Sequence, residues 1–172
     1  MLVALQAIST DLYLPALPAI VQDLETDVAR VQLTLSLFLA TFALAQLVYG
    51  PLSDRLGRRG LLLAGTGLYT AASLACMAAP TIEILVVCRV LQAIGACCGP
   101  VLGRAVVRDV YEPKDAARIL AYIGTAMALA PALGPILGGW LTQAFGWRAT
   151  FGALAVFGAV SIAGILAVLP ET

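Results

Sequence analysis

The sequence predicts an all-α membrane protein whose six transmembrane helices form two inverted three-helix repeats. Hydrophobic residues make up 61% of the chain, whereas soluble proteins have roughly 45–50% apolar residues. These residues form runs long enough to span a bilayer, and a charged motif from the first half reappears in the second half. A soluble fold would expose the excess apolar surface to water, so lipid is the expected solvent of the outer helix faces.

Each predicted helix is an apolar run between charged or Gly/Pro-rich breaks. A transmembrane helix needs roughly 20 mostly apolar residues, and a helix satisfies all its backbone groups internally, as the membrane interior requires. The six predicted helices cover approximately residues 1–21, 31–52, 60–80, 82–105, 117–141 and 147–169.

The breaks follow in order along the chain. An acidic segment that begins at Asp23 ends the first run, and the charged turn of residues 50–59 ends the second. The connection between the third and fourth runs carries Glu83. Basic residues follow the fourth run, and a short connection with Arg148 follows the fifth.

The basic residues gather on one side of the predicted bundle. Arg30 and Arg148 lie in the other connections, and Arg89 lies inside the fourth run. Because Lys and Arg are retained on the cytoplasmic side, we expect both termini to face the cytoplasm. The basic residues in or beside the second–third and fourth–fifth connections are Arg55, Arg58, Arg59, Arg104, Arg108, Lys114 and Arg118.

The charged turn has a second copy 89 residues later in the chain. Residues 50–59 align without gaps on residues 139–148, but the second copy lacks the charges of Asp54, Arg55 and Arg58. Three helices per copy is an odd number, so the second copy is expected to be inverted in the membrane, which is typical of secondary transporters. A chance similarity between two Gly-rich turns is the alternative.

Two charged residues fall inside the apolar runs. Asp11 lies near the middle of the first run, and Arg89 lies about two turns into the fourth. A charge at the bilayer centre costs about 2.5–3.5 kcal/mol on insertion scales, so it is expected to face a cavity or a partner. We expect Asp11 to take up and release a proton, with Arg89 adjusting its proton affinity or pairing with it in one state. A permanent structural ion pair is the alternative.

The fifth run combines prolines with glycines. Pro131 and Pro135 each remove a backbone donor and bend a helix, while Gly134, Gly138 and Gly139 leave a smooth face for another helix. From the residues alone, a kinked and tightly packed helix explains this pattern.

Some polar-tipped residues in the runs are weaker candidates for lining a substrate pocket, and packing explains each of them equally well. These residues are Tyr13, Gln46, Gln92 and Tyr122. Pro100 is expected to interrupt the fourth helix.

The composition argues against several classes of function. The chain has no histidine, which removes His-dependent catalytic sets, the usual zinc ligands and imidazole proton shuttles. Its four cysteines lie in apolar runs, where thiols pack as small hydrophobic groups. A net charge of zero gives no sign of a nucleic-acid partner. We therefore expect neither an enzyme nor a metal site.

Three of these segments together resemble motifs of the major facilitator superfamily. Residues 50–59 match its signature between the second and third helices, G-x-L-x-D-R-x-G-R-[RK], and residues 89–95 resemble its fourth-helix motif, R-x-x-Q-G/A-x-G. Residues 134–139 resemble its fifth-helix motif, G-P-x-x-G-G, which is associated with proton-coupled antiporters. Ala130 stands where that motif usually has its first glycine.

Residues 11–18 and 103–111 narrow the resemblance to the Bcr/CflA drug-resistance family. The resemblance covers the whole chain but only half of the family's twelve-helix fold. It implies the amino-terminal half of an exporter in the bacterial inner membrane, which exchanges small amphipathic or apolar drugs for protons. The proton gradient would be the energy source, with no cofactor, and Asp11 and Arg89 would couple the protons.

The resemblance also implies a gate at the charged turn. Asp54 would cap a helix of the missing half and pair with Arg104 or Arg108 at the inner end of the fourth helix. This latch would hold the outward-facing state and break when the halves rock apart, and the fifth-helix motif would lie at the interface between halves. The other gate residues are Gly50, Arg55, Gly57, Arg58 and Arg59.

Alternatives to this function stay open. Six helices alone would leave a one-sided groove, so the chain acts with a carboxy-terminal half, acts as a homodimer, or is an inactive fragment. An importer of sugars or amino acids fits the fifth-helix pattern less well. An intramembrane enzyme would need a convergent nucleophile and base, which the sequence does not offer.

Overall fold

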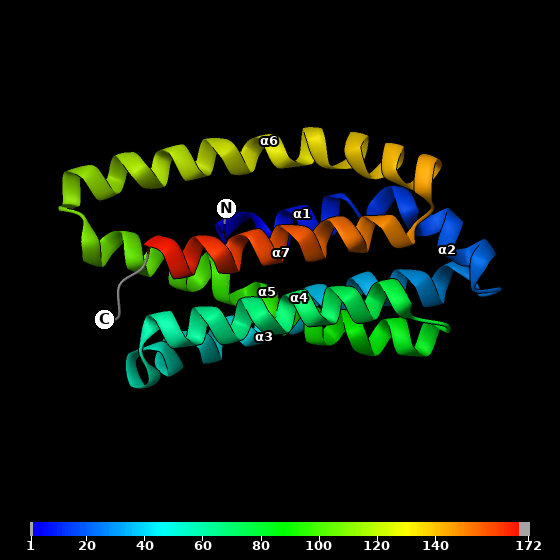
Figure 1. Cartoon of the computed structure of the whole chain (residues 1–172), viewed down its shortest axis with the longest axis horizontal. Helices are drawn as coiled ribbons and strands as arrows, with labels where there is room; N and C mark the ends of the chain where they lie inside the picture. Colours follow the sequence, from blue (N-terminus) through cyan, green and yellow to red (C-terminus); the bar gives the residue numbers. More distant parts are fainter. Residues whose placement is uncertain (1, 169–172) are drawn as a thin grey trace.

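The computed structural model of the chain describes residues 2–168, without the side chains at positions 54, 56, 126 and 168. This part of the chain consists of helices and short turns, and Figure 1 shows them in an elongated bundle. Six of its segments are long and apolar enough to cross a membrane, which confirms the predicted fold class. The elements are η1 (Leu2–Ala4), α1 (Leu5–Asp11), η2 (Leu14–Ala16), α2 (Leu17–Asp23), α3 (Val28–Leu56), α4 (Arg58–Ala78), α5 (Ile82–Val110), α6 (Pro113–Phe145) and α7 (Arg148–Val168).

Several helices are longer than the apolar runs that predicted them. α3 continues to Leu56 through the charged turn, α5 continues to Val110, and α6 covers Pro113–Phe145 rather than 117–141. Arg, Lys and Glu are good helix formers, so a helix continues beyond the hydrocarbon core where its sequence turns polar. Hydropathy therefore marks the embedded part of a helix and not its ends.

The first membrane span is broken near its middle. α1 ends at Asp11, a 3₁₀ turn covers Leu14–Ala16, and α2 begins at Leu17. Pro15 and Pro18 carry no backbone N–H donor, so regular α-helical hydrogen bonding stops between α1 and α2.

By contrast, α5 runs without interruption through Pro100, and the break predicted there is wrong. A proline removes one helical hydrogen bond. Residues 95–100 are all buried, and this packing holds the helix together across the missing bond.

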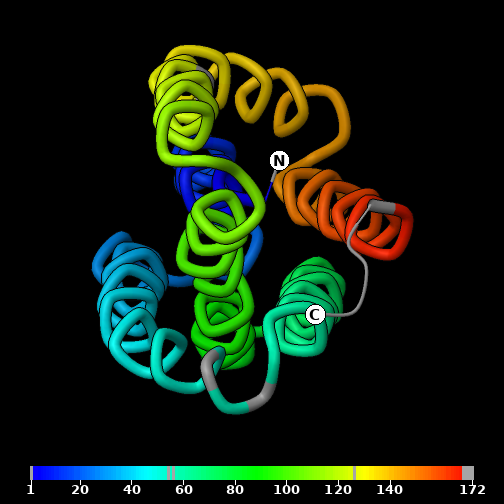
Figure 2. The backbone as a smooth tube through the Cα atoms, turned by 90° about the vertical axis from the view of Figure 1, so that its left-hand side faces the viewer, coloured from blue at the N-terminus to red at the C-terminus, as the bar shows by residue number. Residues whose placement is uncertain are grey.

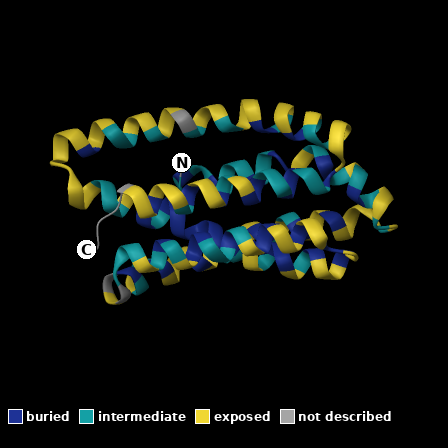
Figure 3. Ribbon diagram, viewed as in Figure 1, coloured by how far each residue is buried: buried dark blue, intermediate teal, exposed yellow. Residues whose placement is uncertain are grey.

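α5 forms the centre of the bundle. α3 and α4 pack along it, η1 and α1 pack across it, and α7 packs on α4. In the end-on view of Figure 2, α3 and α4 lie on opposite sides of α5 and α6 lies at the edge of the bundle. A Cβ added to Gly95 of α5 would lie 2.5 Å from the Tyr69 backbone nitrogen of α4, so this approach requires glycine. Most of α6 is exposed (Figure 3).

The two copies of the repeated motif share one backbone conformation. Gly57, between α3 and α4, has φ 81° and ψ 150°, and Gly146, between α6 and α7, has φ 84° and ψ 166°. This region of backbone space is essentially confined to glycine. The agreement supports a structural repeat over a chance similarity of two turns.

Candidate functional site

A buried arginine lies at the centre of the bundle. Arg89 of α5 has no exposed surface. Its guanidinium carbon lies 4.3 Å from the ring centroid of Tyr13, 4.2 Å from that of Phe38 and 5.8 Å from that of Phe151. We call these three rings, from the first span, α3 and α7, the aromatic cage. Cation–π attraction contributes about 2 kcal/mol or more when the cation is desolvated, so the cage stabilises a charge that pairs with no described carboxylate.

Hydrogen bonds fix the orientation of the guanidinium. Arg89 Nη1 donates to Gln92 Oε1 at 2.7 Å and to the Ser9 carbonyl oxygen at 3.5 Å. Gln92 Nε2 in turn donates to Ser73 Oγ of α4 at 2.8 Å. In the described part of the chain, Arg89 Nε and Nη2 have no acceptor. Two donors of the buried arginine are therefore available to a further acceptor.

One side of the first span is bonded to the core. The Tyr13 hydroxyl lies 2.5 Å from Thr34 Oγ1 of α3, and Ser9 Oγ lies 2.7 Å from the Tyr69 hydroxyl of α4. Ser9 and Tyr13 are both fully buried. They are four residues apart, so one face of the segment presents both to the bundle centre.

Asp11 faces away from this core side. Position 11 lies roughly 200° around a helix from position 9, and a Cβ added to Gly134 of α6 would overlap the Asp11 Cβ. Asp11 Oδ2 is buried without a hydrogen-bond partner among the described residues. No salt bridge joins Asp11 to Arg89, although both side chains are described. This structure therefore does not bring the two predicted charges together.

The predicted antiporter motif of α6 packs on the side of the first span that carries Asp11. A Cβ at Gly138 would overlap the Leu12 carbonyl oxygen, and a Cβ at Gly139 would lie 3.9 Å from Pro15 Cβ. Together with the Gly134 contact, these approaches bring the predicted proton-coupling residue and the predicted motif into one helix–helix contact.

At the charged turn, Arg58 at the start of α4 forms a salt bridge with Asp109 near the end of α5. The predicted gate instead paired Asp54 with Arg104 or Arg108. The Asp54 side chain lies outside the described residues, and neither arginine forms an ion pair with a described acidic residue. Asp109 was missed as a site residue; its signal was a single acidic residue among the basic residues that follow the fourth run.

A second charged cluster lies at the opposite end of the bundle, where α6 turns into α7. Asp23 Oδ2 accepts hydrogen bonds from Trp147 Nε1 at 2.9 Å and from Arg148 Nη1 at 2.5 Å. Arg148 Nη2 donates to the Ala79 carbonyl oxygen of α4 at 3.3 Å. Arg58 in the first copy of the turn thus pairs with the first helix of the second repeat, α5. Arg148 in the second copy pairs with the first span of the first repeat, at the end of α2. Sequence reasoning missed Asp23, although Trp147 and Arg148 stand in the aligned second copy.

The remaining predicted residues lie outside the central region. The exposed ones are Gln46, Arg55, Arg104, Arg108, Tyr122 and Pro131, and the partly buried ones are Gly50, Gly57, Arg59 and Pro135. Gln46, Arg104 and Arg108 line a common cavity of about 300 Å³. Among the described residues, no group of three or more His, Cys, Asp or Glu side chains is arranged to hold a metal ion.

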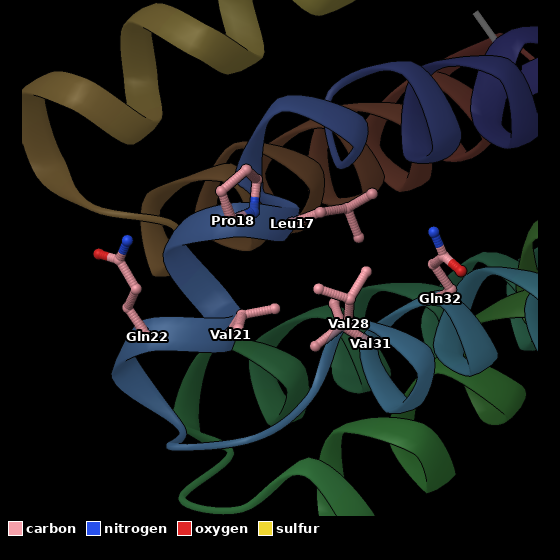
Figure 4. Close-up of a pocket in the computed structure, with 7 residues that line it drawn as sticks. All are labelled: Leu17, Pro18, Val21, Gln22, Val28, Val31 and Gln32. Carbon is pink, nitrogen blue, oxygen red and sulfur yellow. The ribbon is translucent and has the colours of Figure 1, made fainter.

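A separate apolar pocket of about 250 Å³ lies between α2 and α3 (Figure 4). None of the predicted site residues with a described side chain lines it. Its lining consists of Leu17, Pro18, Val21, Gln22, Val28, Val31 and Gln32.

Comparison with known proteins gives a family match along the whole chain. The family described as Major Facilitator Superfamily matches residues 1–172. The chain is 39% identical to a "Chloramphenicol resistance protein" of Pseudomonas aeruginosa over 86% of this chain and 35% of the relative. It is 30% identical to "Multidrug resistance protein D" of Escherichia coli strain K12, over 100% of this chain and 44% of the relative. It is 33% identical to "Multidrug resistance protein MdtL" of Shigella flexneri, over 99% and 44%. The chain spans less than half the length of these relatives.

Proposed function

The chain belongs to the major facilitator superfamily, and from this premise we propose that it forms half of a proton-coupled multidrug exporter of the bacterial inner membrane. Its six apolar helices make it a multi-pass membrane protein of a transporter family. The names of its relatives, which refer to chloramphenicol and multidrug resistance, support small apolar or amphipathic drugs as substrates.

The contact between Asp11 and Gly134 is the observation that carries the proposal. An ionisable residue inside a membrane span is by default a candidate functional residue, and Asp11 Oδ2 is buried without a partner among the described residues. Because the glycine lets α6 approach the Asp11 Cβ directly, a small movement of α6 changes the access of water to this carboxylate.

In the proposed cycle, a proton from the outer side neutralises Asp11, drug affinity falls and the drug leaves outward. Release of the proton to the inside then restores the negative charge. Burial disfavours an ionised carboxylate and access to water favours it. Alternating exposure of Asp11 therefore couples proton transfer to the direction in which the site is open.

Arg89 supplies a fixed positive charge on the other side of the first span. A direct Asp11–Arg89 pair requires α1 to rotate by roughly half a turn, because the two residues lie on opposite sides of that helix. The break at η2 separates α1 from α2, so α1 can turn while α2 stays in place, and this rotation breaks the Ser9–Tyr69 hydrogen bond that holds α1 to α4. The two Arg89 donors without acceptors are then available to Asp11 in the rotated state.

The proposal places both termini in the cytoplasm, because the basic residues gather at that end of the bundle. A second six-helix half, or a second copy of this chain, covers the open side of the bundle. Chemical crosslinking and native-gel mass in detergent distinguish these assemblies, and a strict monomer contradicts the homodimer.

The decisive experiment is Asp11→Asn in a transporter that carries this chain. We expect the substitution to abolish drug transport driven by a pH gradient in inverted membrane vesicles, with membrane insertion unchanged. Asp27→Asn is the matched control, because Asp27 caps α3 at an exposed position and asparagine caps helices equally well. Full transport by the Asp11→Asn variant would overturn the coupling role.

A further inference from the structure

Two arginines and a glutamine surround a cavity between α3 and α5. Arg104 and Arg108 lie four residues apart on α5, so both point to one face of the helix. Gln46 of α3 completes the polar lining of this cavity of about 300 Å³, whose other lining residues are Pro100, Val101 and Ala105. The described lining of the cavity thus gathers hydrogen-bond donors and includes no carboxylate.

The two guanidinium groups have no described counter-charge. Both side chains are exposed, and neither forms an ion pair with a described acidic residue. The acidic side chain next in sequence, Asp109, pairs with Arg58 instead. Like charges one helical turn apart repel each other, so binding an anion between them is favourable.

The depth of the cavity in the membrane indicates the source of the anion. α5 has 29 residues and is about 44 Å long, whereas the hydrocarbon core of a bilayer is about 30 Å thick. Arg108 lies two residues before the end of the helix. With this excess length divided between the two ends of the helix, the Arg108 end of the cavity lies at the level of the phospholipid phosphates.

We propose that the Arg104–Arg108–Gln46 cavity binds the phosphate of an anionic phospholipid. A guanidinium presents parallel N–H donors that match two phosphate oxygens, and the Gln46 amide adds a neutral donor. Basic pockets between transmembrane helices on the cytoplasmic side are suited to anionic headgroups. The site is independent of the proposed proton coupling, since it shares no residue with the Asp11 contact.

The test measures lipid binding by the whole 172-residue chain purified in detergent. Native mass spectrometry reports how much phosphatidylglycerol and how much phosphatidylethanolamine stays bound after each is added. We expect preferential retention of phosphatidylglycerol, and at least about a tenfold weaker affinity in the Arg104→Gln/Arg108→Gln variant, since hydrogen bonds to charged groups are the strong ones. Arg118→Gln, which removes an exposed arginine of α6, is the matched control and should keep the preference.

Two further arms keep the outcome clear. Arg104→Lys/Arg108→Lys keeps both charges but removes the paired donors. It should bind phosphatidylglycerol more weakly than the unsubstituted chain, and it replaces the glutamine variant in the test if that variant does not fold. Inorganic phosphate is added as a competitor. Displacement of the lipid by low concentrations of inorganic phosphate would assign the cavity to free phosphate, and an unchanged phosphatidylglycerol preference in both double variants would overturn the site.

Discussion

Gly134 of α6 packs directly against Asp11 at the end of α1, so closely that a side chain at position 134 would overlap the Asp11 Cβ. The same glycine belongs to a motif that the sequence linked to antiport, and Asp11 is the acidic residue that it linked to protons. These two assignments came from separate segments, and the fold joins them in one contact.

Gly134→Ala should therefore impair proton-coupled transport. The added methyl group overlaps Asp11 Cβ, and relieving such overpacking typically costs about 1–3 kcal/mol or displaces the helix. Gly124→Ala on the same helix is the control, because a Cβ there meets nothing within 4 Å. Drug efflux is compared at equal membrane expression. Equal efflux by the two variants would contradict a functional contact at Asp11.

Replacing a ring of the aromatic cage should destabilise the protein. Phe38 is fully buried and its ring lies 4.2 Å from the Arg89 guanidinium carbon. Phe38→Leu removes the cation–π contact and leaves a cavity, with an expected loss of about 2–4 kcal/mol. Phe145→Leu, at a residue that is 68% exposed, is the control. The thermal unfolding midpoint in detergent should fall clearly for Phe38→Leu alone, and equal midpoints would mean that the cage does not stabilise Arg89.

The Arg58–Asp109 salt bridge between the two repeats should behave as an interacting charge pair. Exchanging the partners as Arg58→Asp/Asp109→Arg should recover part of the stability lost in each single variant. The side chains are 25% and 52% exposed, so solvent screens the pair and the coupling is about 0.2–1 kcal/mol. A double-mutant cycle of unfolding midpoints at low and high salt measures this coupling. Additive effects of the two single variants would show that the pair contributes nothing.

The sequence predicts much of the fold and less of the site. The number of helices follows from the length of each apolar run, and the side on which the basic residues lie follows from their positions between the runs. Both can be read from neighbouring residues in the sequence. The aromatic cage combines residues of three separate spans, and the face that each helix presents depends on how all of them pack. Asp11 and Arg89 were therefore both predicted inside the membrane, but the packing that puts Arg89 on the side of the first span opposite to Asp11 could not be predicted. Pro100 shows the same limit, since burial overrides the local preference for a break.

The repeated glycines give a prediction that depends on backbone conformation alone. Gly57 and Gly146 have φ of 81° and 84° with extended ψ, a region in which a residue with a Cβ is strained by about 1–3 kcal/mol. Gly57→Ala and Gly146→Ala should therefore lower the unfolding midpoint by similar amounts. Gly60 is the third residue of α4, and Gly60→Ala should be neutral or slightly stabilising. A Cβ there meets nothing within 4 Å, and alanine favours the helix. If Gly57→Ala and Gly60→Ala had the same unfolding midpoint, the positive-φ conformation at Gly57 would not require glycine.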